Sequence, residues 1–141
     1  MLPAIAPGNH VMINTLAYGA ALGPWVITRS PLRQGDIIAF ERRDGDESRT
    51  YLKRIVALAG DTISMHDGSV IVNGARVVWP GAVLADHWNM RSSVIPVGAV
   101  FVLGDNRGES NDSRSFGPVP QASIIGKALL IIWPIGNIRP I

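Results

Sequence analysis

The feature that most constrains the fold of this sequence is the even spread of glycine and proline. The 141 residues include 15 glycines and 10 prolines, which divide the apolar residues into short runs. No window repeats apolar residues at intervals of three and four, as a long amphipathic helix would. Short apolar runs bounded by turn residues are typical of β-strands. The sequence therefore predicts a mainly β fold of antiparallel sheets with few or no long helices.

The expected strands share β-branched or aromatic residues and end at turn residues. They cover 36–40, 50–57, 61–65, 69–72, 75–78, 99–103 and 123–133. Asn73-Gly74, between two of these runs, is the strongest short-range hairpin signal. Residues 79–95 show no periodicity, and we expect an insertion between core strands there. The length predicts one domain over residues 1–141.

Composition excludes several classes of protein. There are no cysteines, which rules out disulfides, thiol nucleophiles and cysteine-ligated zinc. The net charge of +2 comes without a dense basic patch, so nucleic-acid binding is not expected. Hydrophobic residues reach 47%, yet the longest apolar run, 128–135, is too short to span a bilayer. Either the protein is soluble or a membrane anchor lies outside this chain.

Lys53 is the first candidate for chemistry. Side chains alternate across a strand, so Tyr51, Lys53 and Ile55 share one face of the run 50–57. An ammonium between apolar neighbours loses hydration and its pKa falls, and a neutral amine can take a proton from a serine hydroxyl. The alternative is an edge-strand lysine that serves solubility. The strand alone favours that alternative.

The second candidate is the polar loop 104–117. Its short polar side chains can fix the shape of a loop, and Asp105, Asp112, Arg107 and Arg114 can pair as carboxylate–guanidinium forks. Its spacing fails the calcium loop of an EF-hand, because Phe116 stands where the closing glutamate belongs. It also fails the phosphate-binding P-loop. These residues by themselves indicate a structured polar loop and no metal site.

Segments along nearly the whole chain resemble the successive sequence boxes of bacterial type I signal peptidases. They are Met1-Leu2-Pro3-Ala4-Ile5, 35–40, 51–61, 72–74, the loop Gly104-Asp105-Asn106-Arg107 with Ser110, Asp112-Ser113-Arg114 and Phe116-Gly117, and the tail 125–134. The resemblance implies the signal-peptidase β fold and a serine endopeptidase with a serine–lysine pair. Such an enzyme removes N-terminal signal peptides of exported preproteins after small residues, at an Ala-x-Ala site, without a metal or cofactor.

The resemblance also implies roles for single residues. Lys53 matches the general base, and Ser110 matches a serine whose hydroxyl orients that lysine. Asp112 and Arg114 match a salt-bridged pair behind the site, and Arg54 is given a structural role. The positions that match the shallow substrate pockets are Met1, Ile5, Ala39, Tyr51 and Leu52. The location implied is the outer side of the bacterial cytoplasmic membrane.

One departure from the family concerns the nucleophile. The family's first box reads serine, methionine, any residue, proline, and Met1 occupies the methionine place, so the serine would immediately precede Met1. Ser30, Ser92 and Ser93 do not replace it. We therefore expect this 141-residue chain not to cleave, and we expect the membrane anchor to precede the serine. To explain the missing serine, we favour truncation, or a start of the chain assigned one residue too late, over natural loss of the serine.

Other functions stay open at this point. The rival enzymes are other serine–lysine peptidases, such as conjugative-transfer peptidases or self-cleaving repressors. The rival from another class is a catalytically dead β domain that binds extended peptides or the membrane surface. His10, His66 and His87 lack metal-ligand spacing and are expected at the surface. Trp133 is expected in the core, whereas Trp25 and Trp88 are candidates for contact with the membrane interface.

Overall fold

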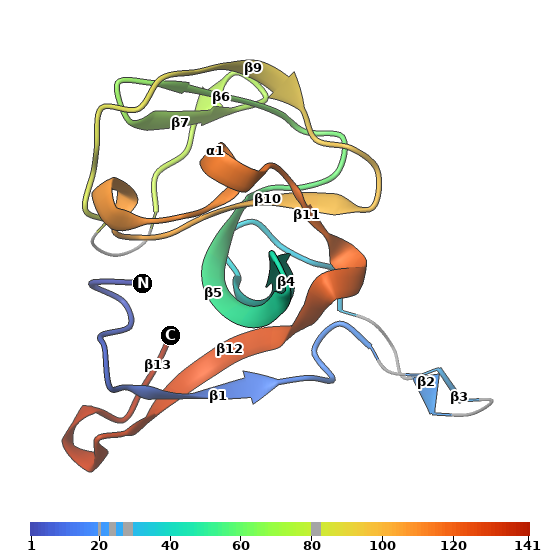
Figure 1. Ribbon diagram of the computed structural model, residues 1–141, viewed down its shortest axis with the longest axis vertical. Coiled ribbons are helices and arrows are strands. Elements are labelled where there is room, and N and C mark those ends of the chain that lie inside the picture. The colour runs from blue at the N-terminus through green and yellow to red at the C-terminus, as the bar shows by residue number, and fades with distance from the viewer. Residues whose placement is uncertain (20, 23–24, 27–29, 80–82) are drawn as a thin grey trace.

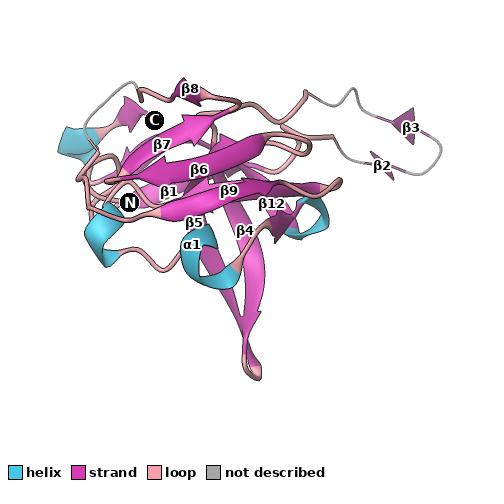
Figure 2. Cartoon of the chain, turned by 90° about the horizontal axis from the view of Figure 1, so that it is seen from above, coloured by secondary structure: helices cyan, strands magenta, loops and turns pink. Residues whose placement is uncertain are grey.

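The structure is a computed structural model that describes residues 1–19, 21–22, 25–26, 30–79 and 83–141 (Figures 1 and 2). Its strands are β1 (His10–Asn14), β2 (Ala21–Leu22), β3 (Trp25–Val26), β4 (Ile37–Asp44), β5 (Glu47–Ala57), β6 (Thr62–His66), β7 (Ser69–Val72), β8 (Ala75–Arg76), β9 (Met90–Val94), β10 (Ala99–Leu103), β11 (Val119–Pro120), β12 (Ile124–Trp133) and β13 (Arg139–Pro140). Its short helices are α1 (Ser113–Phe116) and the 3-10 turns η1 (Arg107–Glu109), η2 (Gln121–Ser123) and η3 (Ile135–Asn137).

The strands form two main antiparallel sheets, as predicted. The larger sheet has the order β1-β12-β4-β5-β10-β11, with β13 paired to β12, and the smaller has the order β8-β7-β6-β9. Figure 1 shows the smaller sheet lying across β10, with β12 and β1 farthest from it. Strands β2 and β3 pair with each other in a separate hairpin. Within the described ranges, no helix has the length and apolarity needed to cross a bilayer.

Strand β10 lies at the centre of the core, and all five of its residues are buried. Val100 and Val102 pack with residues of β4 and β5, whereas Phe101 and Leu103 pack against β6 and β7 of the smaller sheet. A strand that is buried on both faces consists of consecutive apolar residues in the sequence. That explains why the bounds of β10 agree with the predicted run 99–103.

The predicted hairpin at Asn73-Gly74 is confirmed. Both residues have positive φ, 51° and 80°, and Val72 pairs with Ala75 across the turn. Two consecutive positive φ values are what a two-residue turn of type I′ requires. The predicted insertion 79–95 contains β9, which pairs with β6.

Residues 41–49 were not expected to be strand, but they extend β4 and β5 into a long two-stranded arm that Figure 2 shows projecting from the body. The pairing continues to Asp44 opposite Glu47. Ser48 Oγ donates to Glu41 across the arm over 2.7 Å. Both faces of this arm are largely polar, so it has no alternating apolar pattern from which to predict it.

The predicted burial of Trp133 is wrong. Its side chain is 48% exposed, because Trp133 ends β12 opposite the exposed His10 of β1, with 6.4 Å between the two ring centroids. The three histidines are exposed, as expected. Trp88 is 47% exposed and contacts Arg114, as described below. The side chain of Trp25 lies outside the described residues.

Candidate active site

Lys53 and Ser110 are 57 positions apart in sequence and in direct contact in the structure. Lys53 Nζ donates a hydrogen bond to Ser110 Oγ over 2.8 Å. Strand β10 pairs with β5 so that Leu103 lies opposite Arg54, the neighbour of Lys53. The loop that leaves β10 at residue 104 therefore starts beside Lys53, and the strand ladder brings the amine and the hydroxyl together.

Gly104 makes this close approach possible. A Cβ atom at this position would lie 2.6 Å from Ser110 Cβ and 3.4 Å from Lys53 Nζ, and closer still to Ser110 Oγ. Non-bonded carbon atoms do not pack at such short distances. Any residue larger than glycine would therefore push Ser110 away from Lys53.

The amine of Lys53 is half-buried, and burial lowers its pKa below the ordinary value of 10.5. The negative charges of Asp112 and Asp105 oppose this shift in pKa, whereas the positive charge of Arg114 adds to it. The α-amino group of Met1 lies near enough that burial and the charge of Lys53 lower its pKa as well. A lysine with a lowered pKa beside a hydroxyl has the properties of a general base.

Asp112 and Arg114 form the pair predicted for them. Arg114 Nε and Nη2 each donate to the Asp112 carboxylate over 2.8 Å, and Asp112 is fully buried. The amide of Gly104 donates to the same carboxylate over 3.0 Å. Burial alone would raise the pKa of Asp112, but these hydrogen bonds outweigh it and hold the pKa below its usual range. The pair thus fixes the backbone of Gly104.

The other carboxylate–guanidinium pairs considered for this loop do not all form. Asp105 pairs with Arg54 of β5 through two hydrogen bonds of 2.9 and 2.7 Å. Arg107 is buried, but its Nε donates to the Gly104 carbonyl over 3.1 Å, and no described carboxylate pairs with it. The run of polar residues could not show which arginine takes which carboxylate, because the partner of Asp105 comes from β5.

A cavity of about 360 Å³ opens at Lys53 and Ser110. Four of the five residues predicted to bind substrate line it: Met1, Ile5, Tyr51 and Leu52. Ala39 does not; it is buried in β4 with its Cα opposite that of Leu52. The cavity therefore lies between the chain start, β5 and the loop after β10.

One edge of β5 is open beside this cavity. Strand β4 pairs with β5 along residues 47–54, but β10 pairs only with residues 54–57. Residues 50–53 line the cavity, and among the described strands nothing pairs with their second edge. An open strand edge can accept an extended peptide as an additional strand.

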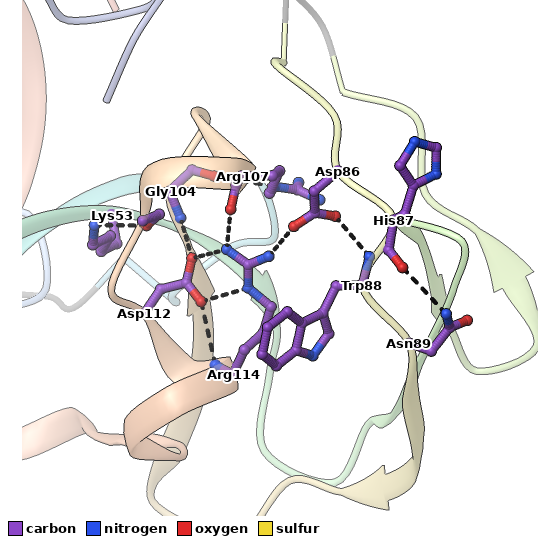
Figure 3. Close-up of polar contacts among 10 residues, drawn as sticks. Lys53, Asp86, His87, Trp88, Asn89, Gly104, Arg107, Asp112 and Arg114 are labelled. Atoms are coloured by element: carbon purple, nitrogen blue, oxygen red, sulfur yellow. Dashed lines mark hydrogen bonds and ion pairs between the residues drawn. The ribbon is translucent and has the colours of Figure 1, made fainter.

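Two residues of the site, Asp86 and Trp88, were not predicted from the sequence. The carboxylate of Asp86 pairs with Arg114 Nη1, and the Trp88 ring centroid lies 5.5 Å from the guanidinium carbon of Arg114 (Figure 3). Both residues lie in the segment without periodicity, so no local pattern connected them to the loop 104–117. In the described ranges, no group of three or more histidine, aspartate or glutamate side chains is placed to hold a metal ion.

Comparisons with known proteins agree on one family. Residues 1–133 match the family described as "Signal peptidase, peptidase S26". The chain is 31% identical over 140 residues to "Probable signal peptidase I-1" of Synechocystis, covering 95% of this chain and 67% of the relative. It is 32% identical over 148 residues to "Signal peptidase I" of Bacillus caldolyticus, covering 95% and 75%.

Two further matches extend the comparison. "Thylakoidal processing peptidase 1, chloroplastic" of Arabidopsis thaliana is 30% identical over 137 residues, with 95% of this chain and 39% of the relative covered. The crystal structure of a signal peptidase I from Enterococcus faecalis superposes with a TM-score of 0.58 at 30% identity. That match covers 70% of this chain and 97% of the Enterococcus chain.

Proposed function

Because the chain belongs to the signal peptidase family, peptidase S26, we propose that it carries the catalytic machinery of a serine endopeptidase that cuts signal peptides from preproteins after small residues. Lys53 acts as the general base in this proposal. The observation that supports it most is the hydrogen bond of Lys53 Nζ to Ser110 Oγ at a half-buried amine that faces a cavity. A lysine on an edge strand that served only solubility would instead extend into water.

The proposed chemistry needs a serine immediately before Met1. Neutral Lys53 takes the proton of that hydroxyl while the oxygen attacks the carbonyl carbon of the scissile peptide bond. The amine then returns the proton to the leaving nitrogen, and an acyl-enzyme remains. Lys53 next takes a proton from water, whose oxygen attacks the ester carbon; the ester bond breaks, the ammonium of Lys53 gives that proton to the departing serine oxygen, and the peptide acid leaves. Ser110 keeps the amine oriented through its hydroxyl.

Substrate binding follows from the open edge of β5. An extended peptide pairs with the backbone of residues 50–53, which gives affinity without regard to sequence. Met1, Ile5 and Leu52 offer an apolar surface to small side chains of the peptide. We propose that these residues, with Tyr51, select alanine-like residues one and three places before the cut bond, and that Ala39, buried opposite Leu52, only supports the pocket from β4.

Asp112 and Arg114 support the site from behind, because they hold the Gly104 amide and with it the start of the polar loop 104–117, called the catalytic loop below. We place the activity at the outer face of the bacterial cytoplasmic membrane, held there by an anchor segment. The substrates are signal peptides of exported preproteins. Residues 1–141 act as one catalytic domain.

A chain with one serine added before Met1, called the Ser-extended chain below, tests the proposal. Its matched control carries alanine at the added position. Both are incubated with a peptide that contains one Ala-x-Ala site, and mass spectrometry locates the cut. We expect cleavage after the second alanine by the Ser-extended chain alone, and its loss in the Lys53→Met variant. The chain that begins at Met1 is expected to be inactive.

Two outcomes would contradict the proposal. Cleavage that persists in Lys53→Met would remove Lys53 as the base. Peptide that binds to a folded Ser-extended chain, measured by calorimetry, but is never cut would favour the rival function, a β domain that only binds extended peptides.

A further inference from the structure

Residues 84–89, called the strap below, connect the smaller sheet to the catalytic loop. At one end, the Leu84 amide donates to the Asp105 carbonyl, and the Arg107 amide donates to the Leu84 carbonyl, each over 2.9 Å. At the other end, the Gly68 amide donates to the Trp88 carbonyl over 3.0 Å, in the turn between β6 and β7. The strap is thus fixed at both ends and passes directly behind Arg114.

The strap supplies two contacts to Arg114 that the catalytic loop does not. The Asp86 carboxylate pairs with Nη1, the one guanidinium nitrogen that Asp112 leaves free. The Asp86 carboxylate also accepts from the Trp88 amide over 3.2 Å, which holds the carboxylate in place. Figure 3 shows Arg114 between Asp112 and Asp86 with the Trp88 ring beside it. Arg114 therefore lies between two carboxylates, and its side chain is only 3% exposed.

The contacts continue from Arg114 to the reacting amine. Arg114 holds the Asp112 carboxylate, Asp112 holds the Gly104 amide, and Gly104 leaves room for Ser110 against Lys53. We propose that Asp86 is a positioning residue of the peptidase site, which fixes the guanidinium of Arg114 and balances its charge. This inference rests on the proposed function for its kinetic consequences, but not for its effect on Lys53 itself.

The charges around Lys53 determine the sign of the effect. The charged groups that act on its amine are Asp112, Asp105 and Arg114. Asp86 compensates the positive charge of Arg114 from the far side. Without that carboxylate, more of the positive charge of Arg114 acts on Lys53, and a nearby positive charge disfavours the ammonium. Loss of Asp86 therefore lowers the pKa of Lys53 further. It also leaves Arg114 held by one carboxylate fewer, so the contacts that align Ser110 with Lys53 through Asp112 and Gly104 loosen and the rate falls.

The test compares Asp86→Asn with Asp67→Asn. Asparagine at position 86 keeps the shape of the side chain and an acceptor for the Trp88 amide, so it removes mainly the charge. Asp67 is exposed and pairs with His87 at the outer side of the strap, with no described contact to Arg114. Its positive φ of 45° is one that asparagine adopts readily. Asp67→Asn thus loosens the strap without changing the charge at Arg114.

The first readout is NMR titration of the Lys53 side chain in the chain that begins at Met1, which needs no peptidase activity. We expect a lower pKa of Lys53 in Asp86→Asn, an unchanged one in Asp67→Asn, and recovery in Asp86→Glu. The second readout is peptide cleavage by the Ser-extended chain. There we expect kcat to fall about tenfold in Asp86→Asn, with KM within about twofold.

An unchanged pKa of Lys53 in folded Asp86→Asn, or an equal shift in Asp67→Asn, would overturn the inference. Absence of cleavage by every variant would contradict the proposed function and leave the NMR comparison to decide the role of Asp86. Asp86→Glu, which keeps the charge, covers the case in which Asp86→Asn does not fold. A pKa of Lys53 equal to the parent value then supports the inference, and a raised one contradicts it.

Discussion

Substitution of Gly104 by alanine is the most specific perturbation of the Lys53–Ser110 contact. The new Cβ would lie 2.6 Å from Ser110 Cβ, where ordinary contacts begin at 3.4 Å. Ser110 would have to move by at least about 0.8 Å, because a packed site cannot absorb the overlap otherwise. The hydrogen bond of 2.8 Å between Lys53 Nζ and Ser110 Oγ would then lengthen to about 3.6 Å, too long for a hydrogen bond.

The consequence for catalysis is large because the amine loses its orientation. A misplacement of about 1 Å in an active site can reduce the rate about 100-fold. For Gly104→Ala in the Ser-extended chain, we therefore expect kcat/KM to fall about 100-fold, or about 2.7 kcal/mol on the barrier. Overpacking also costs about 1–3 kcal/mol of folding free energy. For a chain of this size, that lowers Tm by about 3–12 °C.

Gly108→Ala is the matched control. Gly108 lies in the same loop, a Cβ added to it would meet no atom within 4 Å, and it does not adopt a positive φ. Cleavage of an Ala-x-Ala peptide, followed by chromatography, and thermal unfolding are measured for both variants. Equal kcat/KM for folded Gly104→Ala and Gly108→Ala would refute the claim that Ser110 must contact Lys53.

Three further predictions follow from single features. The kcat/KM of the Ser-extended chain should rise with pH as Lys53 loses its proton. Because burial lowers the pKa of Lys53, we expect the midpoint of the pH–rate profile to lie below 10.5. A midpoint at or above 10.5 would contradict this. Asp112→Asn breaks a fully buried ion pair and should lower the free energy of unfolding in urea by about 3 kcal/mol, whereas a loss below about 1 kcal/mol would show that the pair is dispensable. Gly74→Ala forces alanine to a φ of +80° and should cost about 1 kcal/mol in the same assay, with an unchanged midpoint as the contrary result.

The parts of the fold that the sequence predicts well are those where one local signal dominates. Strand β10 is apolar throughout because both its faces are buried, and Asn73-Gly74 requires the backbone of a tight hairpin turn. The charged arm 41–49 was missed because it pairs as a continuation of the β4–β5 ladder and has no apolar pattern of its own. The exposure of Trp133 depends on where β1 begins beside β12, which the residues around Trp133 do not encode.

The Lys53–Ser110 side of the site was predictable from the sequence, whereas the side formed by Asp86 and Trp88 was not. The approach of Lys53 to Ser110 was expected from the family resemblance, and the register of β5 and β10 gives its physical cause. The contacts of Asp86 and Trp88 with Arg114 depend on how the strap crosses the catalytic loop. Such a crossing is a tertiary arrangement, and single-sequence patterns carry no information about it.

The proposed mechanism depends most on an amine at position 53 that loses its proton more easily than an ordinary lysine. The sequence contains two lysines, Lys53 and Lys127, so NMR titration of isotope-labelled lysine side chains gives two resolvable signals, which Lys127→Arg assigns. We predict that the Lys53 signal titrates with a pKa below 10.5 and that Ser110→Ala alters this titration. A Lys53 signal that titrates at 10.5 or above, with no response to Ser110→Ala, would contradict its role as the general base.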